Sequence, residues 1–147
     1  YNYAGAPWRT QRLVRKLSDT WFRSDLIWMP GDVDGGGMTA FVVFSMMGIY
    51  PVTPGIPVYN IGTPFFSKVT LRLASGRTFV IEAEGASSEN KYIQKATLNG
   101  KPLDRPWIRH SDLAAGGKLV FTMCSRPNKS WGATTPPPSA ERVELTE

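Results

Sequence analysis

The first third of the chain has apolar residues at helical spacing. Leu13, Leu17 and Trp21 lie four residues apart, basic residues lie opposite them, and Pro7 suits the first turn of a helix. The pattern predicts an amphipathic helix over residues 8–22, with its basic residues on the solvated face.

A second helical segment, residues 38–49, is apolar nearly all round. A helix of this kind needs other elements on every side, because no part of its surface favours water. The one helix predicted before it is too little to enclose it. We therefore expect the chain to be a fragment, with further partners of this helix elsewhere in the same protein.

Beyond residue 54 the period changes from helical to alternating, after a stretch rich in proline. The strands that the alternation predicts are residues 69–73, 78–83, 91–98 and 118–123. Asn99-Gly100 follows the third of them and is a strong signal for a hairpin turn. Short strands at this spacing indicate an antiparallel β-sandwich.

The length of 147 residues fits one ordinary domain, or one small domain with part of another. We predict an α+β chain with two domains, a helical one over residues 1–54 and a β-sandwich over residues 55–147. The second domain is expected to end in an extended, proline-rich tail that begins at Thr134.

Charge and cysteine content exclude several classes of site. The formal net charge is +5, but the basic residues near the start alternate with apolar ones at helical spacing, which favours a solvated helix face over nucleic-acid binding. Cys124 is the only cysteine, so neither an internal disulfide nor a zinc site of paired cysteines is possible. No apolar run approaches the roughly 20 residues that cross a bilayer, and no membrane span is expected.

Asp32 and Asp34 lie in a glycine-rich loop that leads directly into the apolar helix. Free N–H groups and the dipole at a helix N-terminus stabilise negative charge, so both carboxylates can stay ionised, as a general base must. Aspartate is also a common N-cap residue. From the residues alone, capping is the favoured role and function the alternative. An EF-hand calcium loop starting at Asp32 fails, because its twelfth position is Val43.

Three other features have simpler explanations than a functional site. His110, the only histidine, precedes Ser111 and Asp112, which favours a turn or helix cap over a catalytic triad. The five tryptophans could include a platform for a sugar ring, although most are expected in the core. The tripeptide 128–130 matches an N-glycosylation acceptor, a pattern frequent by chance.

Six segments, in this order along the chain, resemble glycoside hydrolase family 92. They are YNYAGAPWRTQ (1–11), PGDVDGG (30–36), FSMMGIYPV (44–52), IGTPFF (61–66), ATLNGKPL (96–103) and PNKSWG (127–132). The resemblance covers almost the whole chain, and its most specific part is residues 1–52.

The resemblance implies a fold and a reaction. Residues 1–54 would be the last helices of an (α/α) six-hairpin barrel, and the remainder a β-sandwich packed against it. The implied activity is that of an inverting, calcium-dependent exo-α-mannosidase, secreted or periplasmic. It would remove terminal α-mannose, α-1,2-linked in particular, from mannose-rich oligosaccharides or N-glycans. The chain's partners would be the upstream barrel helices and N-terminal domain of the same enzyme.

The same resemblance gives the loop aspartates a role. In an inverting glycosidase one carboxyl protonates the leaving oxygen, and another, roughly 6.5–9.5 Å away, activates a water. The base role falls on Asp34 and a supporting role on Asp32. The general acid would be a glutamate upstream of this chain, since none here lies in a matching motif. The glutamates present are Glu82, Glu84, Glu89, Glu141, Glu144 and Glu147. Such a fragment would be inactive alone, and a non-catalytic β-sandwich that binds carbohydrate or serves as structural support is the alternative.

Overall fold

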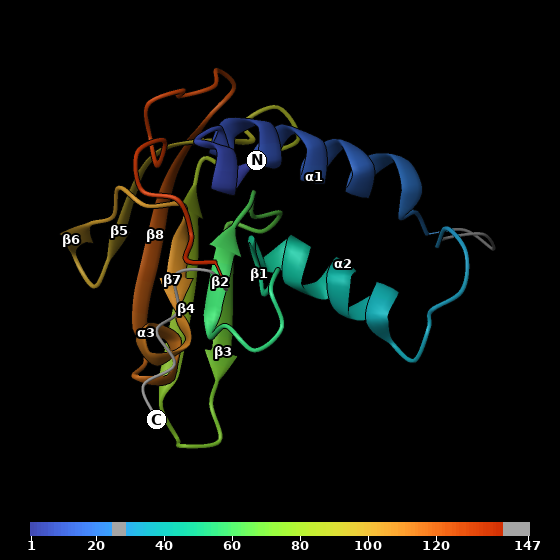
Figure 1. Ribbon diagram of the computed structural model, residues 1–147, viewed down its shortest axis with the longest axis horizontal. Helices are drawn as coiled ribbons and strands as arrows, with labels where there is room; N and C mark the ends of the chain where they lie inside the picture. The colour runs from blue at the N-terminus through green and yellow to red at the C-terminus, as the bar shows by residue number, and fades with distance from the viewer. Residues whose placement is uncertain (25–28, 140–147) are drawn as a thin grey trace.

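The computed structural model of the protein describes residues 1–24 and 29–139. Two long helices project from a body built of two β-sheets, so the chain is α+β as predicted (Figure 1). The helices are η1 (Asn2–Ala4), α1 (Pro7–Trp21), α2 (Gly37–Met47) and α3 (His110–Ala114). The strands are β1 (Ile49–Tyr50), β2 (Val58–Ile61), β3 (Lys68–Arg72), β4 (Thr78–Glu84), β5 (Tyr92–Leu98), β6 (Lys101–Pro102), β7 (Trp107–Arg109) and β8 (Gly117–Cys124).

Local sequence sets the ends of both long helices. α1 starts at Pro7, whose fixed φ suits a first turn. α2 lies between two glycines in the left-handed region, Gly36 at φ 93° and Gly48 at φ 85°. A Cβ atom at Gly48 would lie 2.9 Å from the backbone nitrogen of Pro64. The C-terminal end of α2 therefore sits directly against the β-body.

The face that α1 buries differs from the prediction. Gln11 and Arg15 are buried, whereas Leu17 and Trp21 are about half exposed. The reason is a polar partner on the β-body, because the Gln11 amide oxygen accepts a hydrogen bond of 3.1 Å from the backbone N–H of Ile93. Placing Arg15 on a solvated face was wrong, and the described residues leave the apolar stripe of α1 largely open.

The larger sheet has the strand order β3-β4-β8-β5-β6. The β3–β4 hairpin, β5 and β8 are confirmed, and Asn99 and Gly100, both at positive φ, form the predicted turn before β6. The antiparallel prediction is wrong at one place, since β4 and β8 pair in parallel. β8 lies between two consecutive strands, β4 and β5, that run in opposite directions, so it can be antiparallel to only one of them.

The smaller sheet, in the order β1-β2-β7, was not predicted. Its strands are two to four residues long, too short for alternation to mark them. β1 includes Ile49, so α2 ends two residues earlier than expected. Ile61 and Ile108 of this sheet share one core with Phe79 of the larger sheet, which makes the body a sandwich. β1 and β2 lie on either side of the predicted domain boundary at residue 54, which stays a prediction.

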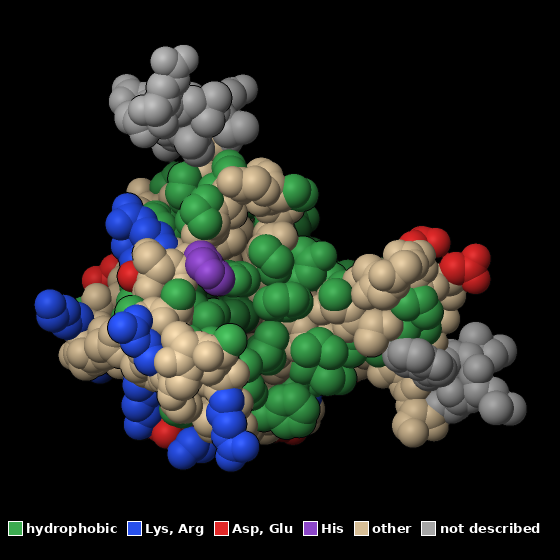
Figure 2. Space-filling model, turned by 90° about the horizontal axis from the view of Figure 1, so that it is seen from below, with side chains coloured by type: hydrophobic (Ala, Val, Ile, Leu, Met, Phe, Trp, Pro, Cys, Tyr) green, Lys and Arg blue, Asp and Glu red, His purple; other side chains and the backbone are tan. Residues whose placement is uncertain are grey.

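The helix pair leaves much apolar surface open. Only Ser45 of α2 is buried, and Val43 is 51% exposed. An apolar groove of about 270 Å³ runs between α1, α2 and the smaller sheet, with Phe41 and Tyr50 among its lining residues. Figure 2 shows apolar side chains continuing from the body onto the projecting part. The described residues do not enclose α2, and none of their helices is long and apolar enough to cross a membrane.

Candidate active site

The loop with Asp32 and Asp34 lies at the end of the helix pair that points away from the sheets (Figure 1). Both aspartates are exposed. The backbone turns tightly here, because the N–H of Gly37 donates to the Asp34 carbonyl at 3.3 Å and the N–H of Met38 donates to the Val33 carbonyl at 3.2 Å. Asp34 has φ 48°, a left-handed conformation that Asp and Asn adopt more readily than most residues.

Helix capping does not account for these two aspartates. The N-cap of α2 is Gly36, no side chain caps the helix, and its first turn holds no acidic residue. Within the described part of the chain, neither carboxylate accepts a hydrogen bond or forms an ion pair. The capping role favoured from the residues alone is therefore wrong, and both carboxylates are available to a ligand or a water molecule.

Aromatic contacts hold the two helices that flank the loop. Phe22, just after α1, lies with its ring centroid 6.0 Å from that of Phe41 on α2. Phe41 in turn contacts Tyr50 edge to face at 5.4 Å. Phe44, one turn further along α2, stacks on Tyr59 of β2 at 6.2 Å. These ring contacts connect the helices on both sides of the loop to the smaller sheet, and so they fix the position of both ends of the loop.

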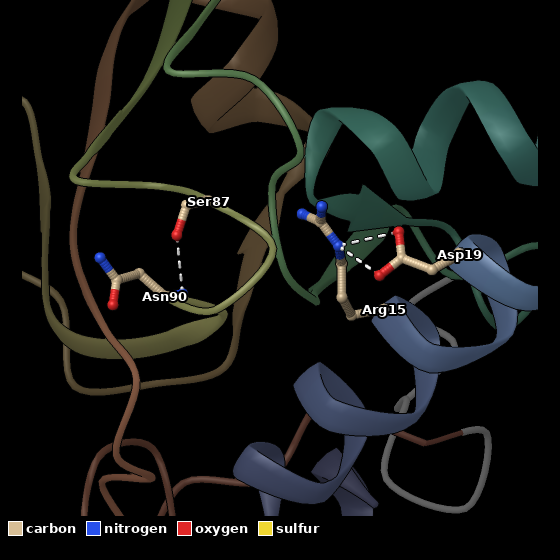
Figure 3. A network of polar contacts seen from close by, with 4 residues as sticks. All are labelled: Arg15, Asp19, Ser87 and Asn90. Atoms are coloured by element: carbon tan, nitrogen blue, oxygen red, sulfur yellow. Dashed lines mark hydrogen bonds and ion pairs between the residues drawn. The ribbon is translucent and has the colours of Figure 1, made fainter.

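Arg15 makes a further connection between the helix pair and the β-body. Its guanidinium carbon lies 3.9 Å from the ring centroid of Phe65, which follows β2. Its Nε donates to both carboxylate oxygens of Asp19, at 3.1 and 3.0 Å (Figure 3). Sequence reasoning missed this contact, because one arginine among several basic helix residues carries no sign that it is buried.

The described residues do not form a complete metal site. None of them gather into a group of three or more His, Cys, Asp or Glu side chains that could hold a metal ion. Asp32 and Asp34 supply two carboxylates, whereas calcium takes about six to eight oxygen ligands. The calcium that the family resemblance implies is therefore not accommodated by the described residues on their own.

Figure 2 shows how charge is distributed on one face of the molecule. Acidic side chains lie at the far end of the projecting part, while most Lys and Arg side chains on this face lie on the β-body. On this face the acidic and most of the basic side chains are therefore separated.

His110 and its neighbours serve structure in this chain. The predicted cap is confirmed, since Asp112 accepts a hydrogen bond of 2.9 Å from the backbone N–H of Arg109 at the start of α3. Asp112 also pairs with Arg105 at 3.1 Å. His110 Nδ1 lies 3.0 Å from the Tyr59 hydroxyl. No described serine and carboxylate complete a triad with this histidine.

The tryptophans divide between core and surface. Trp107 and Trp131 are buried, and the Trp131 indole N–H donates to the Leu103 carbonyl at 2.9 Å. Trp21 is 54% exposed on α1. Trp8 is half-buried, and Trp28 lies outside the described residues.

Glu82 is poorly suited to be the general acid that the family resemblance implies. Its carboxylate pairs with Lys118 at 2.7 Å and with Lys68 at 3.6 Å. The hydrogen bond from Lys118 lowers the pKa of Glu82, whereas a general acid needs a raised one. Glu84 and Glu89 are exposed on the β-body, and the remaining three glutamates lie outside the described residues.

Two solved structures that share this architecture are described as mannosidases. The family GH92 α-mannosidase BT3965 from Bacteroides thetaiotaomicron, in complex with mannoimidazole, matches with a TM-score of 0.91 and 32% identity over 95% of this chain and 19% of its own. The family GH92 inverting mannosidase BT2199 from the same organism matches with a TM-score of 0.85 and 44% identity over 90% of this chain and 18% of its own. Both likenesses are to members of glycoside hydrolase family 92.

The family follows from the sequence match. Residues 1–125 fit the glycosyl hydrolase family 92 catalytic domain, so the chain belongs to that family. An uncharacterized secreted glycosidase of Arthroderma benhamiae is 38% identical over 135 residues, which are 90% of this chain and 17% of the relative. The chain thus spans about a fifth of the length of the relatives it matches.

Proposed function

We propose that this chain is the C-terminal part of an inverting, calcium-dependent exo-α-mannosidase that removes terminal α-mannose, α-1,2-linked in particular, from mannose-rich glycans. The observation that carries the proposal is a loop, in a chain of family 92, with two exposed carboxylates that do not cap the following helix. The family match supports glycoside hydrolysis, and the inverting mannosidase among its relatives supports the stereochemistry. The secreted relative supports a secreted or periplasmic location.

Asp34 is the proposed general base. A water molecule between its carboxylate and the anomeric carbon would lose a proton to Asp34 as it attacks, while the leaving oxygen gains a proton on the opposite face of the sugar. Asp32, two residues away, would orient that water or share the base function. The two carboxylates titrate as a pair if they interact strongly, so both are tested together.

The general acid and the calcium ligands would come from other parts of the same protein. The pKa of Glu82 is lowered, and the described residues hold no group of three or more side chains that could bind a metal ion. Calcium would position sugar hydroxyls, and its dependence is proposed on family membership alone. The chain by itself would accordingly be inactive.

The open apolar surface of the helix pair supports the proposal that other parts of the same protein pack against this chain and complete the site. Leu17 and Val43 are 46% and 51% exposed, on α1 and α2 respectively. Leaving such surface in water costs about 25 cal/mol per Å², so covering it with further helices is favourable. The proposed partners are upstream barrel helices and an N-terminal domain of the same enzyme.

Proton NMR of the first product anomer tests the proposal. The protein that carries this chain is mixed with α-1,2-linked mannobiose, and the anomeric signals of released mannose are followed before mutarotation. Inversion predicts that β-mannose appears first. First appearance of α-mannose would contradict inversion, and absence of any mannose would contradict the activity. Parallel reactions with α-1,3- and α-1,6-linked mannobiose test the linkage preference.

Two controls accompany this experiment. The 147-residue chain alone should release no mannose, since none of its glutamates lies in a motif that matches the family's general acid. Removing calcium with a chelator should abolish release, and adding back calcium, but not magnesium, should restore it, because magnesium demands a smaller and more rigid ligand set. Full turnover in the chelator would contradict the calcium dependence while leaving the hydrolase assignment in place.

A further inference from the structure

The loop that carries Asp32 and Asp34 is held only weakly by its own hydrogen bonds. The bonds donated by the N–H groups of Gly37 and Met38 measure 3.3 and 3.2 Å, longer than the roughly 2.9–3.0 Å that is most common for an N–H···O bond. No side chain caps the helix that follows. The position of the loop therefore depends on the packing of the residues at its two ends.

Phe41 connects these two ends. Its ring centroid lies 6.0 Å from that of Phe22, which directly follows α1, and 5.4 Å from that of Tyr50 in β1. Phe44, the next ring along α2, contacts Tyr50 and Tyr59 of the smaller sheet, but no described ring at the end of α1. One side chain, Phe41, thus joins the chain before the loop, the chain after it and the β-body.

A second side chain anchors the start of the loop. Met29 is only 7% exposed, although it is not part of the core that the two sheets share. Residues 31–35, which follow it, are all exposed. The loop is therefore an exposed stretch between a buried methionine and the half-buried ring of Phe41, and the carboxylates lie within that stretch.

The distance from Phe41 to the loop is short. Phe41 lies four residues after Gly37, the first residue of α2, which is about 6 Å along the helix axis. When a packed ring is lost, the surrounding elements move partway into the space that it leaves. Such a movement reaches Asp34 through a single helical turn, and misplacing a reacting group by about 1 Å can lower a rate about 10²-fold.

We propose that Phe41 is a positioning residue for the general base. Its ring holds the end of α1 and the start of α2 at the separation that places the Asp34 carboxylate on the attacking water. This role rests on the proposed function, because the base role of Asp34 does. Phe41 acts through Asp34 and not on the sugar, so its loss should slow the chemical step without weakening substrate binding.

Steady-state kinetics with α-1,2-linked mannobiose, on the protein that carries this chain, test the proposal. Phe41→Leu keeps an apolar side chain but removes the ring, so kcat should fall about 10- to 100-fold while KM stays within about twofold. Phe41→Tyr keeps the ring and should retain kcat within about threefold. A rise in KM at unchanged kcat would indicate a binding role and overturn the proposal.

A matched control separates positioning from general stability. Phe79→Leu makes the same chemical change at a ring of β4 that is 0% exposed in the shared core. It should lower the melting temperature at least as much as Phe41→Leu does, because a fully buried ring loses more contacts. Assayed below both melting transitions, its kcat should match that of the wild type. An equal fall in kcat would attribute the effect to destabilisation and refute the proposal.

A double-mutant cycle tests the contact itself. Phe22→Leu removes the other ring of the pair and should lower kcat as Phe41→Leu does. The double variant Phe22→Leu/Phe41→Leu should lose little more than either single variant, since both act through one contact. If the two losses multiply, the residues act independently, and the shared contact does not position the loop.

Hydrogen exchange gives a readout that does not depend on activity. In peptides that cover residues 30–40, the backbone amides should exchange about tenfold faster in Phe41→Leu and at the wild-type rate in Phe79→Leu. Unchanged exchange in Phe41→Leu would refute the positioning role whether or not mannose is released. Faster exchange in a protein that releases no mannose would refute the proposed function and leave the control of the loop by Phe41 in place. Normal release with an unchanged kcat for Phe41→Leu would do the reverse.

Discussion

Replacing Arg15 with alanine should destabilise the fold strongly. The hydrophobic pattern of the sequence places Arg15 in solvent, where such a substitution would have little effect. Arg15 is only 8% exposed, donates from Nε to Asp19, and lies 3.9 Å from the Phe65 ring centroid. Arg15→Ala removes the ion pair, the ring contact and the packed stem of the side chain. It also removes Nη1, a buried donor without a partner among the described residues.

The magnitude follows from these four contributions. The ion pair is worth about 0.5 kcal/mol, because the Asp19 side chain is 46% exposed and stays hydrated without Arg15. A desolvated cation–π contact contributes about 2 kcal/mol, and the space left by the stem costs about 1.5 kcal/mol. Removing the unpaired donor returns about 1 kcal/mol. The net loss of unfolding free energy should be about 3 kcal/mol.

Urea unfolding of the full chain, followed by circular dichroism, measures this loss. The matched variant Asp19→Asn removes the ion pair and keeps the ring contact, so it should cost only about 0.5 kcal/mol. The difference between the two variants isolates the contact with Phe65. If Arg15→Ala costs no more than Asp19→Asn, the ring contact and the packing of Arg15 contribute nothing, and the reasoning is wrong.

Two further predictions concern the frame of the fold. Gly48→Ala should cost at least 2 kcal/mol more than Gly100→Ala in the same urea assay, because both glycines have positive φ but only Gly48 faces backbone, at 2.9 Å from Pro64; equal costs would show that the approach to Pro64 is soft. Glu82 has a lowered pKa, so its pairing with Lys118 stabilises the fold above the ordinary carboxyl pKa and is lost as pH falls through the lower folded value. Glu82→Gln should therefore be less stable than the wild type at pH 7 and equal to it at about pH 2, and a constant difference across this range would contradict the assignment.

Patterns longer than about five residues predicted the regular parts of this fold correctly. The extent of α1, the β3–β4 hairpin and the Asn99-Gly100 turn all depend on local preferences that tertiary contacts did not override. β1 and β7 were not predicted, because a strand of two or three residues is too short to show an alternation of apolar and polar positions. The parallel pairing of β8 with β4 depends on the order of strands in the sheet, which the local sequence of each strand does not predict.

The orientation of α1 and the role of the loop show a different limit. Hydrophobic pattern predicts which face of a helix prefers burial, but not which partner is present, and here Gln11 and Arg15 meet the β-body instead of the Leu17 face. For the loop, residue preferences favoured capping, and only the geometry shows that Gly36 takes the N-cap position and leaves Asp32 and Asp34 free. The base role itself comes from the family.

The most direct test of the central claim is the turnover of Asp34→Asn in the protein that carries this chain. Asparagine tolerates φ 48° and matches the shape of aspartate, so only the proton acceptor is lost. The rate of mannose release should fall about 10²–10⁴-fold with an unchanged melting temperature. Asp104→Asn, at an exposed position of the β-body, should leave the rate unchanged. A rate for Asp34→Asn within about threefold of the wild type would contradict the assignment of Asp34 as the base, since loss of a general base costs far more.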